Sequence, residues 1–218
     1  MQPALLQQWV AVAAAMMLLV VFALLAQRHM RALLRWFALQ GVVLALTSAL
    51  VAFVANVPEL YISALLALIL KGFLLPWMLW RIVINLGMHR EVEPLVNVSV
   101  TLLIGAALVL FSFYVSLPIE KLSQLVTRNT IAIALACVLL SMLMMITRRK
   151  AITQVVGFLA MENSLFFTAT SATYGMPLLV EIGVAFDVLI AALIFGLFFF
   201  QIRKTFDSLD IEHLEDKH

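Results

Sequence analysis

The chain has 218 residues, of which 65% are hydrophobic and 12% are charged, and its mean hydropathy is +1.11. A soluble domain is roughly one-quarter charged, so this composition excludes an ordinary soluble protein and indicates an integral membrane protein. The net charge is +2, and the single cysteine, Cys137, excludes a disulfide framework and a CxxC metal or redox motif.

Seven apolar runs are long enough to cross a membrane, and they predict an all-α, polytopic fold. The first run lacks a positively charged start and a small-residue cleavage site, so we expect it to remain as a helix rather than to be a signal peptide. The spans are expected near residues 4–26, 33–55, 60–84, 95–117, 129–147, 152–173 and 177–202. They divide the chain into a four-helix region at 1–128, a three-helix region at 129–204 and an acidic tail at 205–218.

Basic residues alternate along the connectors between these runs. Of the 14 Lys and Arg residues, 11 lie in or flank the odd-numbered connectors or follow the last run, two lie in the even-numbered connectors, and Lys71 lies in the middle of a run. Because cytoplasmic loops of membrane proteins are rich in Lys and Arg, this asymmetry predicts that the N-terminus lies outside and the C-terminus in the cytoplasm.

The third span, LYISALLALILKGFLLPWMLWRIV, carries Lys71 near the middle of the membrane. Pro76 follows five residues later; it lacks an N–H and would clash with the carbonyl of Gly72, so we expect a kink beside Lys71 and a freed backbone carbonyl. In one interpretation the lysine snorkels to an interface. In the other it is a buried cation that faces a polar pathway and pairs with a carboxylate of this chain or of a neighbour.

Each of the last two spans carries a carboxylate about ten residues from its start, Glu162 in one and Asp187 in the other. At a rise of roughly 1.5 Å per residue both lie near mid-depth, where a charge costs about 2.5–3.5 kcal/mol even on the lenient insertion scale. Glu181 lies nearer the outer side and points away from Asp187, so it is either a near-interface acid or a rival for the same role.

Polar residues follow Glu162 along its span. Asn163, Ser164 and Thr168 either bond to carbonyls of their own helix or hold waters that lead from Glu162 toward the outer side. Together, Lys71, Glu162 and Asp187 favour proton or ion conduction, and the alternative is a static salt bridge that fixes helix register. The sequence has no phosphate-binding glycine loop, no catalytic triad and no nucleic-acid surface, so we expect no catalytic centre, cofactor or metal site in this chain.

Several short motifs carry a family resemblance: MEN at Met161–Asn163, VEIG at Val180–Gly183, LKGFLLP at Leu70–Pro76, and the acid at Asp187. With them the chain resembles hydrogenase-4 component E, a membrane subunit of group 4 [NiFe] hydrogenase complexes of the formate hydrogenlyase type. The last three spans are similar to two three-helix proteins, the K component of complex I and the C component of Mrp-type antiporters. In that similarity Glu162 takes the place of the first acid, and Asp187 or Glu181 takes that of the second.

The resemblance implies a non-catalytic subunit of a prokaryotic inner-membrane complex that couples redox chemistry to proton or ion translocation. The implied partners are antiporter-like membrane subunits and soluble-arm subunits of the [NiFe] hydrogenase and iron–sulfur type. Two alternatives stay open: a subunit of an Mrp-type cation/proton antiporter without a redox partner, and a scaffold whose charges only fix assembly.

Overall fold

The computed structural model describes residues 3–55, 58–85, 92, 95–122, 128–173, 183, 189–190 and 196. This part of the chain forms helices and no strand, so the all-α prediction is confirmed. The elements are α1 (Pro3–Ala26), α2 (Met30–Ala55), α3 (Glu59–Ala67), the π-helix η1 (Leu68–Leu74), α4 (Leu75–Asn85), α5 (Val98–Leu122), α6 (Arg128–Thr147) and α7 (Ala151–Thr173). Because α3, η1 and α4 follow one another without a gap, they form one continuous rod.

Five spans in the described part of the chain are long and apolar enough to cross a membrane: Gln8–Ala26, Met30–Phe53, Leu60–Ile84, Val98–Leu117 and Thr130–Thr147. Helix α7 has 23 residues and is therefore about 35 Å long, which exceeds a hydrocarbon core of roughly 30 Å. Its polar residues, among them Gln154, Glu162 and Asn163, make it less apolar than those five. A sixth span at α7 and a seventh at 177–202, most of which lies outside the described residues, stay predictions, as does the orientation.

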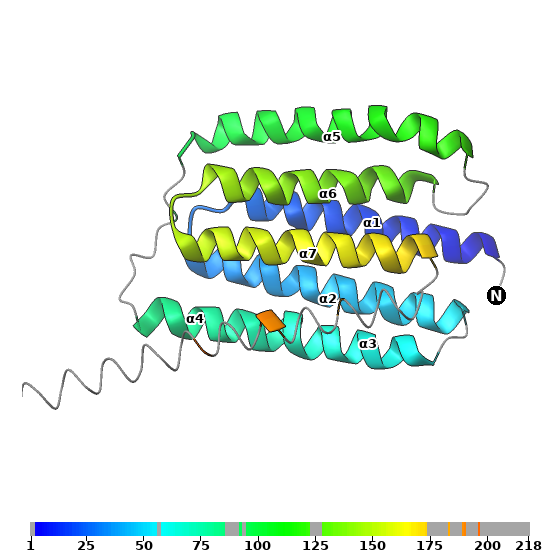
Figure 1. The fold of residues 1–218 in the computed structure, drawn as a ribbon, viewed down its shortest axis with the longest axis horizontal. Helices are drawn as coiled ribbons and strands as arrows, with labels where there is room; N and C mark the ends of the chain where they lie inside the picture. The colour runs from blue at the N-terminus through cyan, green and yellow to red at the C-terminus, as the bar shows by residue number, and fades with distance from the viewer. Residues whose placement is uncertain are drawn as a thin grey trace, which may run out of the picture.

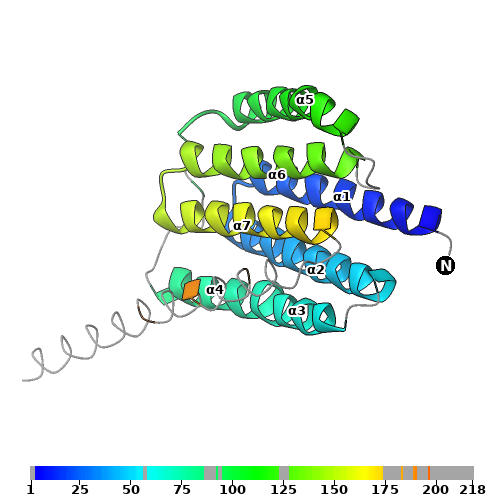
Figure 2. The same cartoon turned by 45° about the vertical axis from the view of Figure 1, so that its right-hand side comes forward.

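The helices form an elongated array with α5 at one edge and the α3–η1–α4 rod at the other (Figures 1 and 2). Helix α5 packs on α6 and α1, while α2 lies in the middle and contacts α1, α3, η1, α4 and α7. Successive rods alternate in direction, so the connectors after α1, α4 and α6 lie at the same end (Figure 1). We call this the basic end, because it holds Arg28, Arg81 and residues 148–150.

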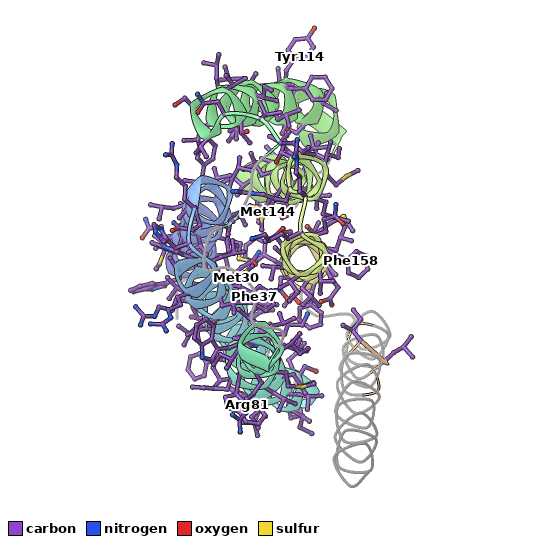
Figure 3. All side chains as sticks on the ribbon, turned by 90° about the vertical axis from the view of Figure 1, so that its left-hand side faces the viewer. Met30, Phe37, Arg81, Tyr114, Met144 and Phe158 are labelled. Atoms are coloured by element: carbon purple, nitrogen blue, oxygen red, sulfur yellow. The ribbon has the colours of Figure 1, made fainter. Side chains whose placement is uncertain are left out.

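Apolar side chains fill the interior and also cover the outer faces. Met30, Phe37 and Met144 are buried between the helices, whereas Tyr114 points away from the bundle on α5 (Figure 3). Leu103, Leu110 and Tyr114 of α5 are more than 70% exposed. Such large exposed apolar side chains on one helix are expected where lipid or a partner subunit, rather than water, surrounds the protein.

Hydrogen bonds tie the connectors together at the basic end. The Val92 N–H donates to the Arg28 carbonyl, and the Leu95 N–H donates to the Thr147 carbonyl, both at 2.8 Å. These two bonds hold the connector after α4 against the ends of α1 and α6.

A buried arginine caps one helix at the same end. Arg148 donates from Nη2 to the carbonyls of Leu25 at 2.6 Å and Gln27 at 3.0 Å. The last carbonyls of a helix lack intrahelical donors, so Arg148 supplies donors at the C-terminal end of α1. Burial lowers the pKa of this guanidinium.

Candidate functional site

A buried ion pair joins the two halves of the chain. Lys71 Nζ lies 2.8 Å from Glu162 Oε1 and 2.9 Å from Oε2, so the ammonium donates to both carboxylate oxygens. The side chains are 1% and 9% exposed. Lys71 comes from η1 and Glu162 from α7, and α2 packs against both elements. Of the two sequence interpretations of Lys71, the contact matches a buried cation paired with a carboxylate of the same chain.

The distortion predicted beside Lys71 takes the form of the π-helix η1. The Leu75 N–H donates to the carbonyl of Leu70, five residues earlier, instead of to the residue four earlier. Pro76 comes next, with no N–H of its own and a ring that would press on the Gly72 carbonyl in a regular helix. The wider turn accommodates the Pro76 ring and the Gly72 carbonyl without a break in the rod. Single π-turns of this kind often occur at functional sites.

Gly41 of α2 lets two helix backbones meet at Lys71. A Cβ atom on Gly41 would lie 2.7 Å from both the carbonyl carbon and the carbonyl oxygen of Lys71, and 2.9 Å from the nitrogen of Gly72. Only a glycine therefore allows this approach, because the colliding atoms are backbone and cannot rotate away. The contact holds the main chain of the buried lysine against α2.

A polar contact beside the ion pair links α2 to α7. Gln40 donates from Nε2 to the Ala160 carbonyl at 3.1 Å, and Asn163 donates from Nδ2 to Gln40 Oε1 at 3.4 Å. Both side chains are fully buried, and Asn163 Oδ1 has no partner in the described part of the chain. Gln40 was not predicted as a site residue because it is not ionisable; its only signal in the sequence is a lone amide beside a glycine in an apolar helix.

An aromatic ring also lies beside the lysine. The centre of the Phe166 ring lies 5.0 Å from Lys71 Nζ, within range of a cation–π interaction. A Cβ on Gly183 would lie 2.6 Å from Cδ2 of this ring, so the glycine of the VEIG motif packs directly on Phe166. Neither contact was predicted from the sequence.

The other predicted site residues divide into two groups. The hydroxyls of Ser164 and Thr168 donate to carbonyls four residues earlier, Ala160 and Ser164, at 2.8 Å, which is the within-helix alternative. Asp187 and Glu181 lie outside the described residues, so their relation to the pair stays a prediction. Among the described side chains, no group of three His, Cys, Asp or Glu residues is placed to hold a metal ion.

Comparisons with known proteins give relatives that span most of the chain. An uncharacterized protein of Mycobacterium tuberculosis is 36% identical over 191 residues, or 87% of each chain. Hydrogenase-4 component E of Escherichia coli K12 is 26% identical over 179 residues, which cover 82% of this chain and 83% of that protein, and the protein of the same description from Shigella flexneri matches equally. No model of a known protein family matches the chain. No solved structure matches it either.

Proposed function

Because this chain belongs to the hydrogenase-4 component E family as a distant member, we propose that it is a membrane subunit of a hydrogenase-type complex. In this proposal it has no catalytic centre, and the hydrogen and electron chemistry belongs to [NiFe] hydrogenase-like and iron–sulfur partner subunits. The basic end faces the cytoplasm of a prokaryotic cell, in agreement with the charge asymmetry of the connectors. Antiporter-like subunits are its neighbours within the membrane.

We further propose that Lys71 and Glu162 form one step of a proton path that is coupled to redox turnover. The observation that carries this proposal is their direct contact at 2.8 Å inside the bundle, beside a π-helix. Charges in such a position are expensive, and in membrane proteins they mark ion pathways more often than they serve as packing. Asp187, with Glu181 as the alternative, is the proposed next acid.

The step works through the mutual dependence of the two charges. A proton that binds Glu162 neutralises the carboxylate and removes its attraction for the buried Lys71 ammonium. The loss of this attraction favours onward transfer of the proton, which restores the ion pair. A charge that moves in a neighbouring protein of the complex alters the same balance, so the pair can couple proton transfer to events elsewhere.

Purification tests the assignment to a complex. The chain is isolated from native membranes in mild detergent, and the co-purifying proteins and their metals are identified. Nickel, iron–sulfur subunits and large antiporter-like subunits are the expected companions. Antiporter subunits without nickel or iron would contradict the hydrogenase assignment and favour the antiporter alternative.

A substitution tests the path. In the purified complex, Glu162→Gln is expected to leave assembly intact and to abolish proton movement across vesicles while redox turnover continues. Ser141→Ala is the matched control, because it removes a buried hydroxyl of α6 that bonds only to its own helix. An assembled Glu162→Gln complex that moves protons at the wild-type rate would rule out the proposed path.

A further inference from the structure

A pocket opens between α2 and α4 at the basic end of the bundle. Its volume is about 490 Å³, which falls within the range of small-ligand sites. It is lined by Arg31, Leu34, Arg35 and Ala38 of α2 and by Pro76 and Trp80 of α4. Neither Lys71 nor Glu162 belongs to this lining, so the pocket is a different place from the proposed proton path.

The lining changes from charged to apolar with depth along the helices. Arg31 follows Met30, the first residue of α2, and Arg35 and Ala38 come roughly one and two turns further along. On α4, which runs in the opposite direction, Trp80 lies near the helix end and Pro76 about one turn deeper. The Arg31 guanidinium lies 5.0 Å from the centre of a Trp80 ring, so these two side chains mark the mouth.

The positive charge at the mouth is not neutralised within the described part of the chain. Both arginines are exposed, and no described carboxylate lies within ion-pair distance of either. A guanidinium binds phosphate oxygens in a bidentate fashion, and two of them one turn apart can hold one phosphate from two sides. A tryptophan at the same level is typical of the membrane interface.

We propose that this pocket binds an anionic phospholipid, with its phosphate between Arg31 and Arg35 and the start of an acyl chain along Leu34, Ala38 and Pro76. Charge and an aromatic ring at the mouth, with an apolar floor beneath them, match the headgroup at the interface and the acyl chain below it in a lipid. Basic pockets between membrane helices are known to select anionic headgroups. A free acidic peptide would use the arginines but would leave the apolar floor without a partner.

Native mass spectrometry of the full-length chain in mild detergent tests this proposal. The delipidated protein is titrated with phosphatidylglycerol and, separately, with phosphatidylcholine of the same acyl chains. The wild type is expected to bind phosphatidylglycerol preferentially. The Arg31→Gln/Arg35→Gln variant is expected to lose roughly 30-fold in affinity for it, and each single variant roughly 5-fold. The single variants keep the test decisive if the double variant does not purify.

Arg81→Gln is the matched control, because Arg81 is an exposed arginine of α4 at the same end that does not line the pocket. It is expected to bind phosphatidylglycerol as the wild type does, and an equal loss there would overturn the proposal in favour of general electrostatic attraction. Equal binding of both lipids, or unchanged binding in both single variants, would overturn it as well. If phosphatidylglycerol binds only after residues 205–218 are removed, the chain's own acidic tail is the occupant and the proposal is wrong.

Discussion

Removing one member of the Lys71–Glu162 pair takes this ion-pair contact away from the other, which stays buried. At 2.8 Å and an effective dielectric constant of about 20, the Coulomb attraction is about 6 kcal/mol, most of which offsets the cost of desolvating both groups. The lysine is only 1% exposed, so it cannot recover hydration by a small rotation. We therefore expect Lys71→Met and Glu162→Leu each to destabilise the protein by about 3–5 kcal/mol.

The double variant Lys71→Met/Glu162→Leu should be much more stable than the two single effects predict. Replacing both charges with apolar groups of similar volume removes the desolvation cost together with the attraction, so we expect a loss below about 2 kcal/mol. The four proteins are compared by reversible unfolding in mixed detergent–SDS micelles, with Ser141→Ala as the control. The assigned pairing would be refuted if each single variant unfolds with a free energy within about 1 kcal/mol of the wild type, or if the loss in the double variant equals the sum of the two single losses.

The same double variant separates a proton path from a scaffold. If the charges only fix helix register, the double variant, which is more stable than either single variant, should assemble and should regain the coupled proton movement that the single variants lose. If they carry protons, it should assemble and remain uncoupled, because the titratable carboxylate is gone. Proton uptake by vesicles that contain the assembled complex distinguishes these outcomes.

Three further substitutions test the surroundings of the site and the basic end. Gly41→Ala brings a methyl group to 2.7 Å from the Lys71 backbone, so we expect about 1–3 kcal/mol of destabilisation in the same micelle assay, and wild-type stability would refute the close approach. Gln40→Leu leaves the buried Asn163 amide without its partner and is expected to cost about 1–3 kcal/mol, against less than about 1 kcal/mol for Thr47→Val, whose hydroxyl bonds only to its own helix. Arg148→Met removes the hydrogen bonds to the carbonyls of Leu25 in α1 and of Gln27 just after it, and should lower the thermal midpoint in detergent by more than Arg149→Met, whose side chain is exposed; equal midpoints would contradict the capping role.

The sequence was informative where a single residue conflicts with its surroundings. A lysine and a glutamate at mid-depth in apolar helices are anomalous regardless of how the helices pack, so both were identified as site residues. Pro76 likewise indicated a distortion of its helix. The choice of partner for Lys71 was out of reach, because it depends on which helices α2 brings together. The π-turn was also not predicted, since the widened hydrogen bond is a response to packing as well as to the proline.

Gln40 and Gly41 show why neutral residues escaped notice. Neither is costly enough in a membrane helix to attract attention, and a glycine in an apolar run has many possible reasons. Their importance arises from what each one meets on the facing helix: Gln40 binds the Ala160 carbonyl of α7, and Gly41 packs against the backbone of Lys71. Five of the seven predicted spans agree with apolar helices in the described part of the structure, because length and hydropathy are local properties of the sequence. Helix α7 differs because it carries polar groups whose partners lie on neighbouring helices.

The π-helix also acts as a phase shifter along its rod. One extra residue in a helical turn rotates everything beyond it by roughly 100° relative to a regular helix. The direction in which Pro76 and Trp80 face is therefore set by the register of η1, several residues away. If η1 closed into a regular helix with all of its residues, α4 would have to turn about its own axis, whereas deleting one residue of η1, such as Ile69, would remove the extra residue and leave α4 facing as it does. That turn of α4 would carry Trp80 away from Arg31, so the centre of the bundle and its charged rim share one register.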